Sequence, residues 1–311
     1  MSGNDTSNDK AVVAITPIES ETPFRRNARD FFYSRLASIG LVALVSILLA
    51  ALLAPVLAPQ DPYDLATLDI MNSRLPPGER SSDGRLIFLL GTDEQGRDLL
   101  SAILYGLRIS IAVGFASTII ALVIGLLAGL TAGYAGGRIE SVVMRIADIQ
   151  LSFPPILIAL ILLALTGPGV SRIIVALVAV QWAYYARTAR GAALVERRKQ
   201  YVEAAAGLGI SPLRIVVRHL LPNCMPPLIV MAALQVASAI SLEATLSFLG
   251  LGLPVTEPSL GLLIANGFQY LLSGKYWISF FPGIALLVTV VAINLVADRL
   301  RDVLNPYSTN G

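Results

Sequence analysis

Charged side chains are scarce in this chain of 311 residues. Only 14% of the residues are charged, whereas 55% are hydrophobic, and the mean hydropathy is +0.71. This balance leaves too little polar surface for a soluble domain of this size, and the apolar residues form long uninterrupted runs. The sequence therefore predicts an all-α protein that crosses a membrane several times.

Histidine and cysteine each occur once, as His219 and Cys224. One cysteine excludes an internal disulfide, and its apolar surroundings favour an inert buried thiol. With no second histidine and no nearby cysteine pair, His219 is expected to be a hydrogen-bonded structural residue rather than a pH sensor or metal ligand. We expect no cofactor and no bound metal.

Sequence features of an enzyme are also missing. No GxxxxGK[ST] sequence occurs, so the usual glycine-rich loop for ATP phosphates is lacking. No nucleophile with a plausible base stands in a consistent setting, so no catalytic residue is expected. The net charge of +2 is too small to indicate nucleic-acid binding. Energy for any transport would come from another subunit.

Six uncharged runs are candidates for crossing a bilayer core of about 30 Å, which takes about 20 helical residues. They cover residues 36–60, 109–137, 149–171, 173–186, 220–242 and 276–297. The run 173–186 spans only if Arg172 and Arg187 reach opposite interfaces, and its approach through 167–171 predicts a tight hairpin. The Gly, Pro and Asn content of 250–267 favours a partly re-entrant external segment over a seventh span through 258–274.

The positive charges predict the orientation. With both termini inside, 16 of the 23 lysines and arginines fall on inside segments and 7 on outside segments, the bias of the positive-inside rule. No charged residue lies within the six spans, which argues against an ion-coupled carrier. Glu243, at the outer end of the fifth span, is interpreted as a substrate or partner contact, or as a solvated or capping carboxylate.

The segment from Glu203 to Pro222, EAAAGLGISPLRIVVRHLLP, is a polar and basic interruption between apolar runs. Two glycines, a serine and a proline in 207–212 supply the residues that end one helix and begin the next. Pro222 predicts a bend where the chain re-enters the membrane. A helix lying on anionic lipid is the alternative, but lipid adhesion requires neither the small residues nor this spacing.

This spacing resembles the EAA signature of ABC-importer permeases, which is EAA, three residues, Gly, nine residues, Ile, one residue and Leu-Pro. His219 stands where the general pattern has Ile, a departure similar to the RHxLPN form of the peptide and nickel subfamily. Stretches at 91–111, 243–252 and 294–306 extend the resemblance over residues 25–307. Leu260-Gly261 departs from the Trp-Gly pair common in these relatives.

The resemblance implies six transmembrane helices: an N-terminal anchor plus the five-helix core of a type I importer permease, with both termini cytoplasmic. The expected parts are a disordered tail (1–24), the anchor helix (25–60), an external loop with an interfacial helix (61–106), the permease core (107–300) and a cytoplasmic tail (301–311). The interfacial helix is predicted from an apolar stripe that starts at Leu99 and ends at Leu107. It packs on neighbouring helices or contacts a delivery protein.

The resemblance further implies a permease subunit of an importer in a bacterial or archaeal cytoplasmic (inner) membrane. The implied partners are a second homologous permease, two cytoplasmic ATPase subunits, an extracytoplasmic substrate-binding protein and the lipid bilayer. The implied cargo is a di- or oligopeptide, with a nickel chelate or another small solute as the alternative. An ion-coupled secondary transporter and a non-transporting scaffold are the alternatives of a different class.

Two sets of residues follow as candidate sites. The implied ATPase-coupling set is Glu203, Ala204, Ala205, Gly209, Ser211, Pro212, Arg214, Arg218, His219, Leu221 and Pro222, with Leu213, Ile215 and Val216 as apolar anchors. The candidate lining of the transport pathway is the polar groups at membrane depth, Ser117, Thr118, Gln181, Gln235, Ser238 and Asn294. The alternative for the second set is hydrogen bonding between helices.

Overall fold

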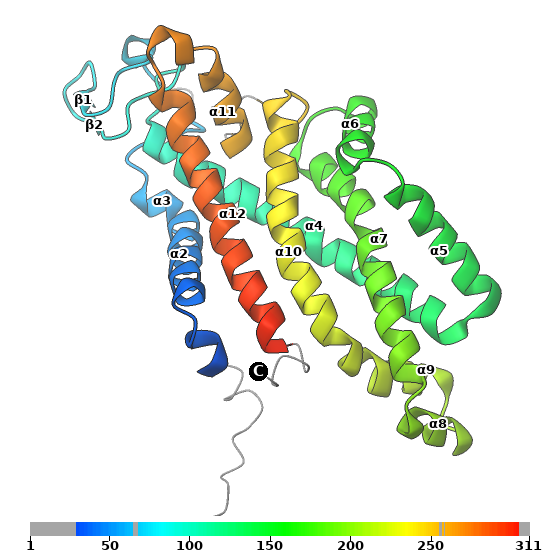
Figure 1. Ribbon diagram of the computed structural model, residues 1–311. Coiled ribbons are helices and arrows are strands. Elements are labelled where there is room, and N and C mark those ends of the chain that lie inside the picture. The colour runs from blue at the N-terminus through cyan, green and yellow to red at the C-terminus, as the bar shows by residue number, and fades with distance from the viewer. Residues whose placement is uncertain (1–28, 65–67, 255–256, 258, 305–311) are drawn as a thin grey trace, which may run out of the picture.

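A computed structural model describes residues 29–64, 68–254, 257 and 259–304 of the chain. The described part is mostly helical (Figure 1). The longer helices are α2 (Arg35–Leu52), α4 (Leu99–Ala135), α5 (Gly137–Leu151), α6 (Pro155–Thr166), α7 (Val170–Arg197), α10 (Leu221–Phe248) and α12 (Trp277–Leu304). The shorter elements are α3 (Ala54–Leu57), η2 (Ile70–Asn72), β1 (Glu79–Arg80), β2 (Ile87–Phe88), α8 (Gln200–Gly207), α9 (Pro212–Ile215), η3 (Val216–Leu220), α11 (Leu260–Phe268) and η4 (Leu271–Ser273).

Four helices in the described residues are long and apolar enough to cross a membrane. They are α2, α4, the continuous helix from Pro212 to Phe248 that contains α9 to α10, and α12. A fifth span results if α5 and α6, which are bent by 89° at their junction, count as one. The predicted count of six spans is therefore not confirmed. Helix α7 is not among the candidate spans; its apolar residues are interrupted by arginines at 172, 187, 190 and 197 and by Glu196.

The predicted span 149–171 is wrong as a single helix. Helix α5 ends at Leu151, and α6 begins only at Pro155. Two adjacent prolines at 154 and 155 cause the break, because proline lacks the N–H that a helix interior needs. Helix α6 has 12 residues, or about 18 Å at 1.5 Å per residue. The tight hairpin predicted at 167–171 is confirmed, since α6 ends at Thr166 and α7 begins at Val170.

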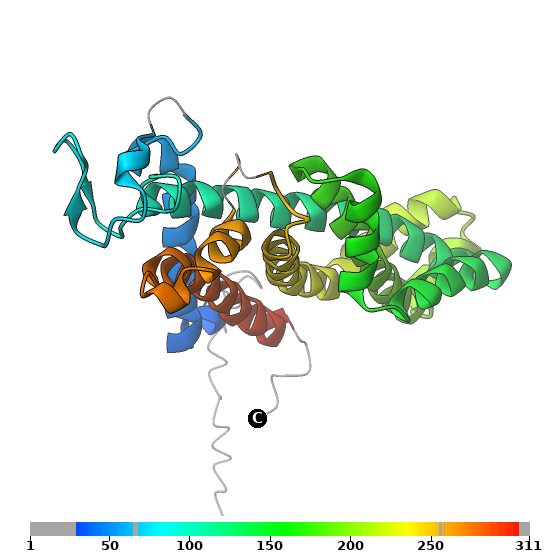
Figure 2. The ribbon, with the colours of Figure 1, turned by 90° about the horizontal axis from the view of Figure 1, so that it is seen from above.

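Helix α4 has 37 residues and runs obliquely past most of the other helices (Figures 1 and 2). It packs against α2, α5, α7, α10, α11 and α12. The predicted separate interfacial helix is wrong, because the apolar stripe from Leu99 to Leu107 forms the first turns of α4 and is largely buried. The Asp98 carboxylate caps this helix by accepting from the Ser101 N–H at 2.8 Å.

The most extensive helix contact joins α4 to α7 through small residues. Gly125, Gly129 and Gly133 recur every four residues on α4, opposite Ala186, Ala189 and Ala193 of α7. A Cβ at Gly133 would lie 2.8 Å from the Ala193 Cβ, and a Cβ at Gly129 would overlap the Ala186 carbonyl oxygen. Small residues at such spacing let two backbones approach closely in a membrane. This pairing positions α7, from which the 203–222 segment continues.

The stretch 91–98 anchors the loop at the opposite end of the molecule from the 203–222 segment (Figure 1). Its Asp93 and Arg97 form a fully buried ion pair with Oδ2 and Nε 2.6 Å apart, and Asp93 Oδ1 also accepts the Gln95 N–H at 2.8 Å. The Trp277 ring, at the start of α12, donates to the Thr92 carbonyl at 3.4 Å. The stretch 91–98 therefore joins the loop to both α4 and α12.

Glu243 is neither solvated nor a cap, contrary to one of its two interpretations. Its side chain is fully buried in α10, where Ser110 Oγ of α4 and Ser247 Oγ each donate to the carboxylate at 2.7 Å. A buried carboxylate needs such donors to offset its lost hydration. The nearby α11 has only nine residues and packs against α10 and α12, so it is too short to cross the membrane.

The glycine contact between α4 and α7 can be tested by adding a single methyl group. We expect Gly129→Ala to lower the free energy of unfolding by about 1–3 kcal/mol, because the backbones must separate to admit it. Gly191→Ala is the matched control: this glycine of α7 has no atom within 4 Å of its added Cβ, so we expect a change within about 1 kcal/mol. Equal unfolding free energies in mixed micelles would contradict the contact.

Candidate functional site

The 203–222 segment has the predicted architecture of helix, turn and helix. Helix α8 ends at Gly207, and α9 starts with Pro212 at its first position. Between them Gly209 has φ +72°, a left-handed conformation that side chains with a Cβ rarely adopt. Ser211 occupies the N-cap position of α9, although its hydroxyl makes no capping hydrogen bond.

The predicted bend at Pro222 is not found. Residues 212–248 form one continuous helix, with five residues, Val216–Leu220, in a π-helical turn directly before the proline. The wider π-turn coincides with the place where Pro222 cannot donate to the preceding turn. Asn223 Nδ2 donates to the His219 carbonyl at 2.8 Å at this point. The second helix of the segment is therefore the start of α10, with no break between them.

The segment has one buried and one open face. Val202, Ala205 and Ile215 are buried together with Leu220 against α7 and α10. The exposed residues are Glu203, Ala204, Ala206, Gly207, Leu208, Gly209, Ser211, Pro212, Leu213, Arg214, Val217, Arg218 and Pro222. Leu208 and Leu213 are 82% and 75% exposed, which is unusual for leucines at one site. The open face therefore combines small, apolar and basic side chains.

The apolar anchors predicted from sequence need correction. Leu213 is exposed as expected, but Ile215 is only 1% exposed and holds α9 against the core, and Val216 is half-buried. Leu208 and Val217 supply exposed apolar surface that sequence reasoning missed. Of the other predicted residues, Ala205 is buried, and His219 and Leu221 are half-buried. Periodicity alone could not show which face packs on the rest of the molecule.

A hollow of about 690 Å³ lies beside Glu203, between α8, the end of α7 and the end of α4. Glu203, Ala206, Arg197 and Arg198 are among its lining residues. The Arg197 guanidinium donates to the Tyr134 carbonyl at 2.7 Å and lies over the Tyr134 ring at 5.6 Å. The open face of the segment therefore continues into a concave, charged surface.

A hydrogen-bond network fixes the segment to its neighbours. The Tyr201 hydroxyl donates to the Glu196 carboxylate, which also pairs with Lys199 at 2.7 Å. Asn223 Nδ2, on α10, donates to the Tyr201 oxygen at 3.0 Å. Burial and the Glu196 carboxylate raise the pKa of Tyr201 to about 12, so its hydroxyl stays a donor at neutral pH. Tyr201 thus joins α7, α8 and α10.

His219 and Cys224 sit beside this network. The His219 ring packs near the Tyr201 ring, with centroids 6.0 Å apart, and makes no side-chain hydrogen bond to the described residues. The expected side-chain hydrogen bond of His219 is therefore not found among the described residues; its ring packs, and its backbone carbonyl accepts from Asn223. Cys224 is fully buried, as the sequence predicted. Tyr201 and Asn223 were not predicted from the sequence, where the only indication of their role is that they flank the 203–222 segment.

The candidate pathway residues divide into two groups. Ser117, Thr118 and Gln181 are buried, and Gln181 contacts the Thr118 hydroxyl at 3.4 Å and the Gln235 carbonyl at 3.2 Å. These bonds join α4, α7 and α10, which is the alternative of bonding between helices. The remaining three are more accessible: Ser238 is exposed, and Gln235 and Asn294 are half-buried.

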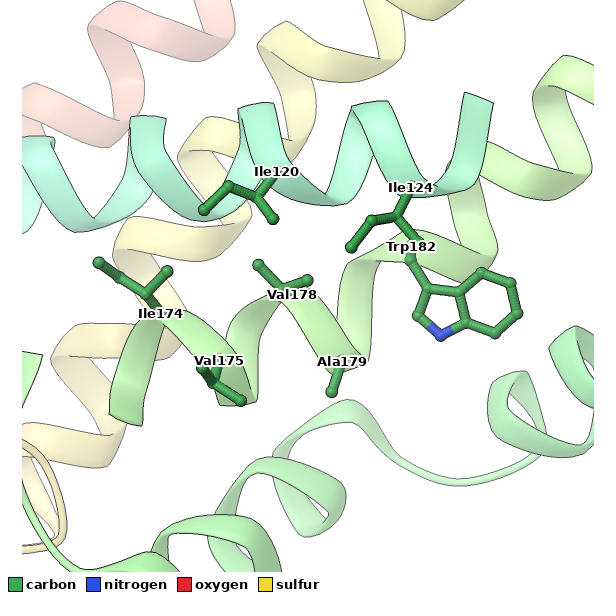
Figure 3. A pocket seen from close by; sticks show the side chains of 7 residues that line it. All are labelled: Ile120, Ile124, Ile174, Val175, Val178, Ala179 and Trp182. Atoms are coloured by element: carbon green, nitrogen blue, oxygen red, sulfur yellow. The ribbon is translucent and has the colours of Figure 1, made fainter. Parts of the chain in front are cut away.

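An apolar hollow of about 540 Å³ opens between α4 and α7 (Figure 3). It is lined by Ile120 and Ile124 of α4 and by Ile174, Val175, Val178, Ala179 and Trp182 of α7. The indole N–H of Trp182 donates to Gln150 Oε1 of α5 at 2.5 Å. Its lining offers no charged group to orient a polar ligand, so this hollow is a poor candidate for a substrate site.

Comparison with known proteins places these features in a family. Residues 121–308 match the family described as binding-protein-dependent transport system inner membrane component, and residues 22–77 match the N-terminal TM domain of oligopeptide transport permease C. The fold is similar to that of a chain in an inward-facing structure of the MetNI methionine ABC transporter, with a TM-score of 0.53 and 23% identity. That likeness covers 66% of this chain and 96% of the other.

Curated relatives match along nearly the whole chain. The di/tripeptide transport system permease protein DppC of Pseudomonas aeruginosa is 38% identical over 289 residues, covering 93% of this chain and 94% of the relative. The dipeptide transport system permease protein DppC of Escherichia coli K12 is 38% identical over 303 residues, covering 97% and 98%. The chain therefore belongs to the family of binding-protein-dependent transport system inner membrane components.

Proposed function

We propose that this chain is a permease subunit of an ATP-driven importer and forms half of a transport pathway for di- or oligopeptides. Membership of the binding-protein-dependent transport family is the observation that carries the proposal. The names of the full-length relatives, which are peptide transport permeases, support the cargo. A second permease completes the pathway, and an extracytoplasmic binding protein delivers the peptide.

The open face of the 203–222 segment is the proposed contact for a cytoplasmic ATPase subunit. Its small residues, Ala204, Ala206 and Gly207, allow a partner surface to approach closely, and Leu208 and Leu213 are exposed enough to act as anchors. Glu203, at the rim of the charged hollow, can pair with a basic group of the partner. The positive-inside bias of the lysines and arginines supports a cytoplasmic location for this end.

The proposed coupling runs from the segment into helix α10. ATP binding draws two ATPase subunits together, and each carries the segment that is docked on it. Because α9 continues without interruption into α10, and because Tyr201 joins the segment to α7, the displacement reorients the membrane helices. This movement exchanges inward-open and outward-open states, and hydrolysis resets the cycle. The proposal requires that the segment bind the two ATPase states with different free energies.

Substituting the exposed leucines tests the docking surface. We expect Leu208→Asp or Leu213→Asp to weaken binding of the ATPase to the permease pair by roughly 10- to 100-fold, the effect of removing an interface anchor. Leu272→Asp is the matched control, because Leu272 is fully exposed and follows Tyr270, which bonds to Glu94 of the 91–98 stretch at the opposite end of the molecule. Affinity measured in nanodiscs checks the result. An unchanged affinity for both leucine variants would contradict docking on this face.

The turn offers a separate test of geometry. No atom lies within 4 Å of a Cβ added at Gly209, so its left-handed φ, and not internal space, restricts this position. We expect Gly209→Asn to keep peptide-stimulated ATPase activity, because asparagine tolerates this conformation. Gly209→Val should lose most of that activity, because the left-handed conformation costs a β-branched residue about 1–2 kcal/mol or more. Equal activities in reconstituted transporters would show that the turn conformation is not required.

A further inference from the structure

A cavity of about 770 Å³ lies between α7, α10 and α12, next to the 203–222 segment. Its volume falls within the range of about 300–1,000 Å³ typical of small-molecule sites. Its lining consists of Thr188 of α7, Asn223, Pro226, Pro227, Val230, Met231 and Leu234 of α10, and Arg301 and Leu304 of α12. Its lining residues on α10 lie in the N-terminal half of that helix, and those on α12 lie in its last turn.

The face of helix α10 that lines the cavity has an apolar part and a part that contains two prolines. Its lining residues recur at three- and four-residue spacing from Asn223 to Leu234, as residues on one helical stripe do. Val230, Met231 and Leu234 form an apolar wall. At the other end of the stripe, Pro226 and Pro227 have no N–H, so the carbonyls one turn earlier, at 222 and 223, lack their regular helical donors. Of these two residues, Asn223 lines the cavity.

Helix α12 supplies a positive charge. The Arg301 side chain is exposed, and it forms no ion pair with a carboxylate in the described part of the chain. Arg299, two residues earlier, instead donates to the Asp30 carbonyl and lies 3.9 Å from Asp302. An arginine presents a planar fork of donors that matches a carboxylate. The cavity therefore has a cationic group on α12 and, on α10, Asn223 next to carbonyls that lack their regular helical donors.

We propose that this cavity is a subsite of the pathway that binds the backbone of a short zwitterionic peptide. The terminal carboxylate pairs with Arg301, and the terminal ammonium is received by the acceptors around Asn223. The apolar wall accepts a side chain without a specific polar contact, which suits transport of many sequences. This inference rests on the proposed peptide function and adds to it the groups that recognise the cargo.

The position of Asn223 connects the cavity to the coupling segment. Asn223 lines the cavity and also donates to the Tyr201 hydroxyl at 3.0 Å and to the His219 carbonyl at 2.8 Å. A peptide that bonds to the Asn223 amide competes with or reinforces these two bonds. Occupancy of the subsite and the position of the 203–222 segment are thereby linked through one side chain.

Protection of an introduced cysteine tests the subsite directly. The complete transporter, without its binding protein, is placed in nanodiscs with the substitutions Cys224→Ser and Met231→Cys. The rate at which N-ethylmaleimide alkylates the introduced cysteine is then measured in the presence of alanyl-phenylalanine or of its C-terminal amide. We expect the free dipeptide to slow alkylation and the amide to need about 10-fold more for equal protection, because it loses a charge-assisted bond. Leu234→Cys serves as a second reporter if Met231→Cys impairs assembly.

The matched arginine variants decide the assignment. Arg301→Gln should raise the half-protecting concentration of the free dipeptide about 10-fold and abolish the difference between acid and amide. Arg145→Gln, which changes an exposed arginine of α5, should preserve both. No protection at either reporter, or an unchanged acid-to-amide ratio in Arg301→Gln, would overturn the subsite. Failure of ATP-dependent peptide uptake by the wild-type transporter with its binding protein would instead contradict the proposed function.

Discussion

The close contact between α4 and α7 is the constraint on which the rest of the structure depends. Lipid tails are as apolar as leucine, so helices in a bilayer associate through packing and not through burial from water. Three glycines of α4 against three alanines of α7 provide that packing. Helix α4 in turn contacts α2, α5, α10 and α12, and α7 leads into the 203–222 segment. The packed pair of α4 and α7 thus connects the helix bundle to the 203–222 segment, which is the proposed contact for the ATPase.

The 203–222 segment is fixed to the bundle in two ways, both of which suit the transfer of a displacement. Its second helix is the start of α10, so there is no flexible joint between the docking face and the membrane helix. Its first helix is held by Tyr201, which bonds to Glu196 of α7 and accepts from Asn223 of α10. Since Asn223 also lines the cavity with Arg301, the proposed cargo site and the proposed ATPase contact share one residue.

Sequence patterns predicted the parts of this fold that depend on local chemistry. Long uncharged runs identified α2, α10 and α12, and the left-handed glycine and the following proline located the turn between α8 and α9. The helix break between 151 and 155 was not predicted, because the span was assigned from the apolar character of the whole run, which two adjacent prolines do not change. The buried state of Ile215 and the cavity around Arg301 could not be predicted, because both arise where helices distant in sequence meet.

The central claim is that the open face of the 203–222 segment docks on an ATPase. A photo-crosslinking amino acid in place of Leu213 tests it most directly, in the complete transporter in native membranes, with the same amino acid at Leu272 as the control position. The account predicts a crosslinked adduct between this chain and the ATPase subunit from position 213 and none from position 272. Adducts with lipid alone at position 213, in a transporter that still takes up peptide, would contradict the account.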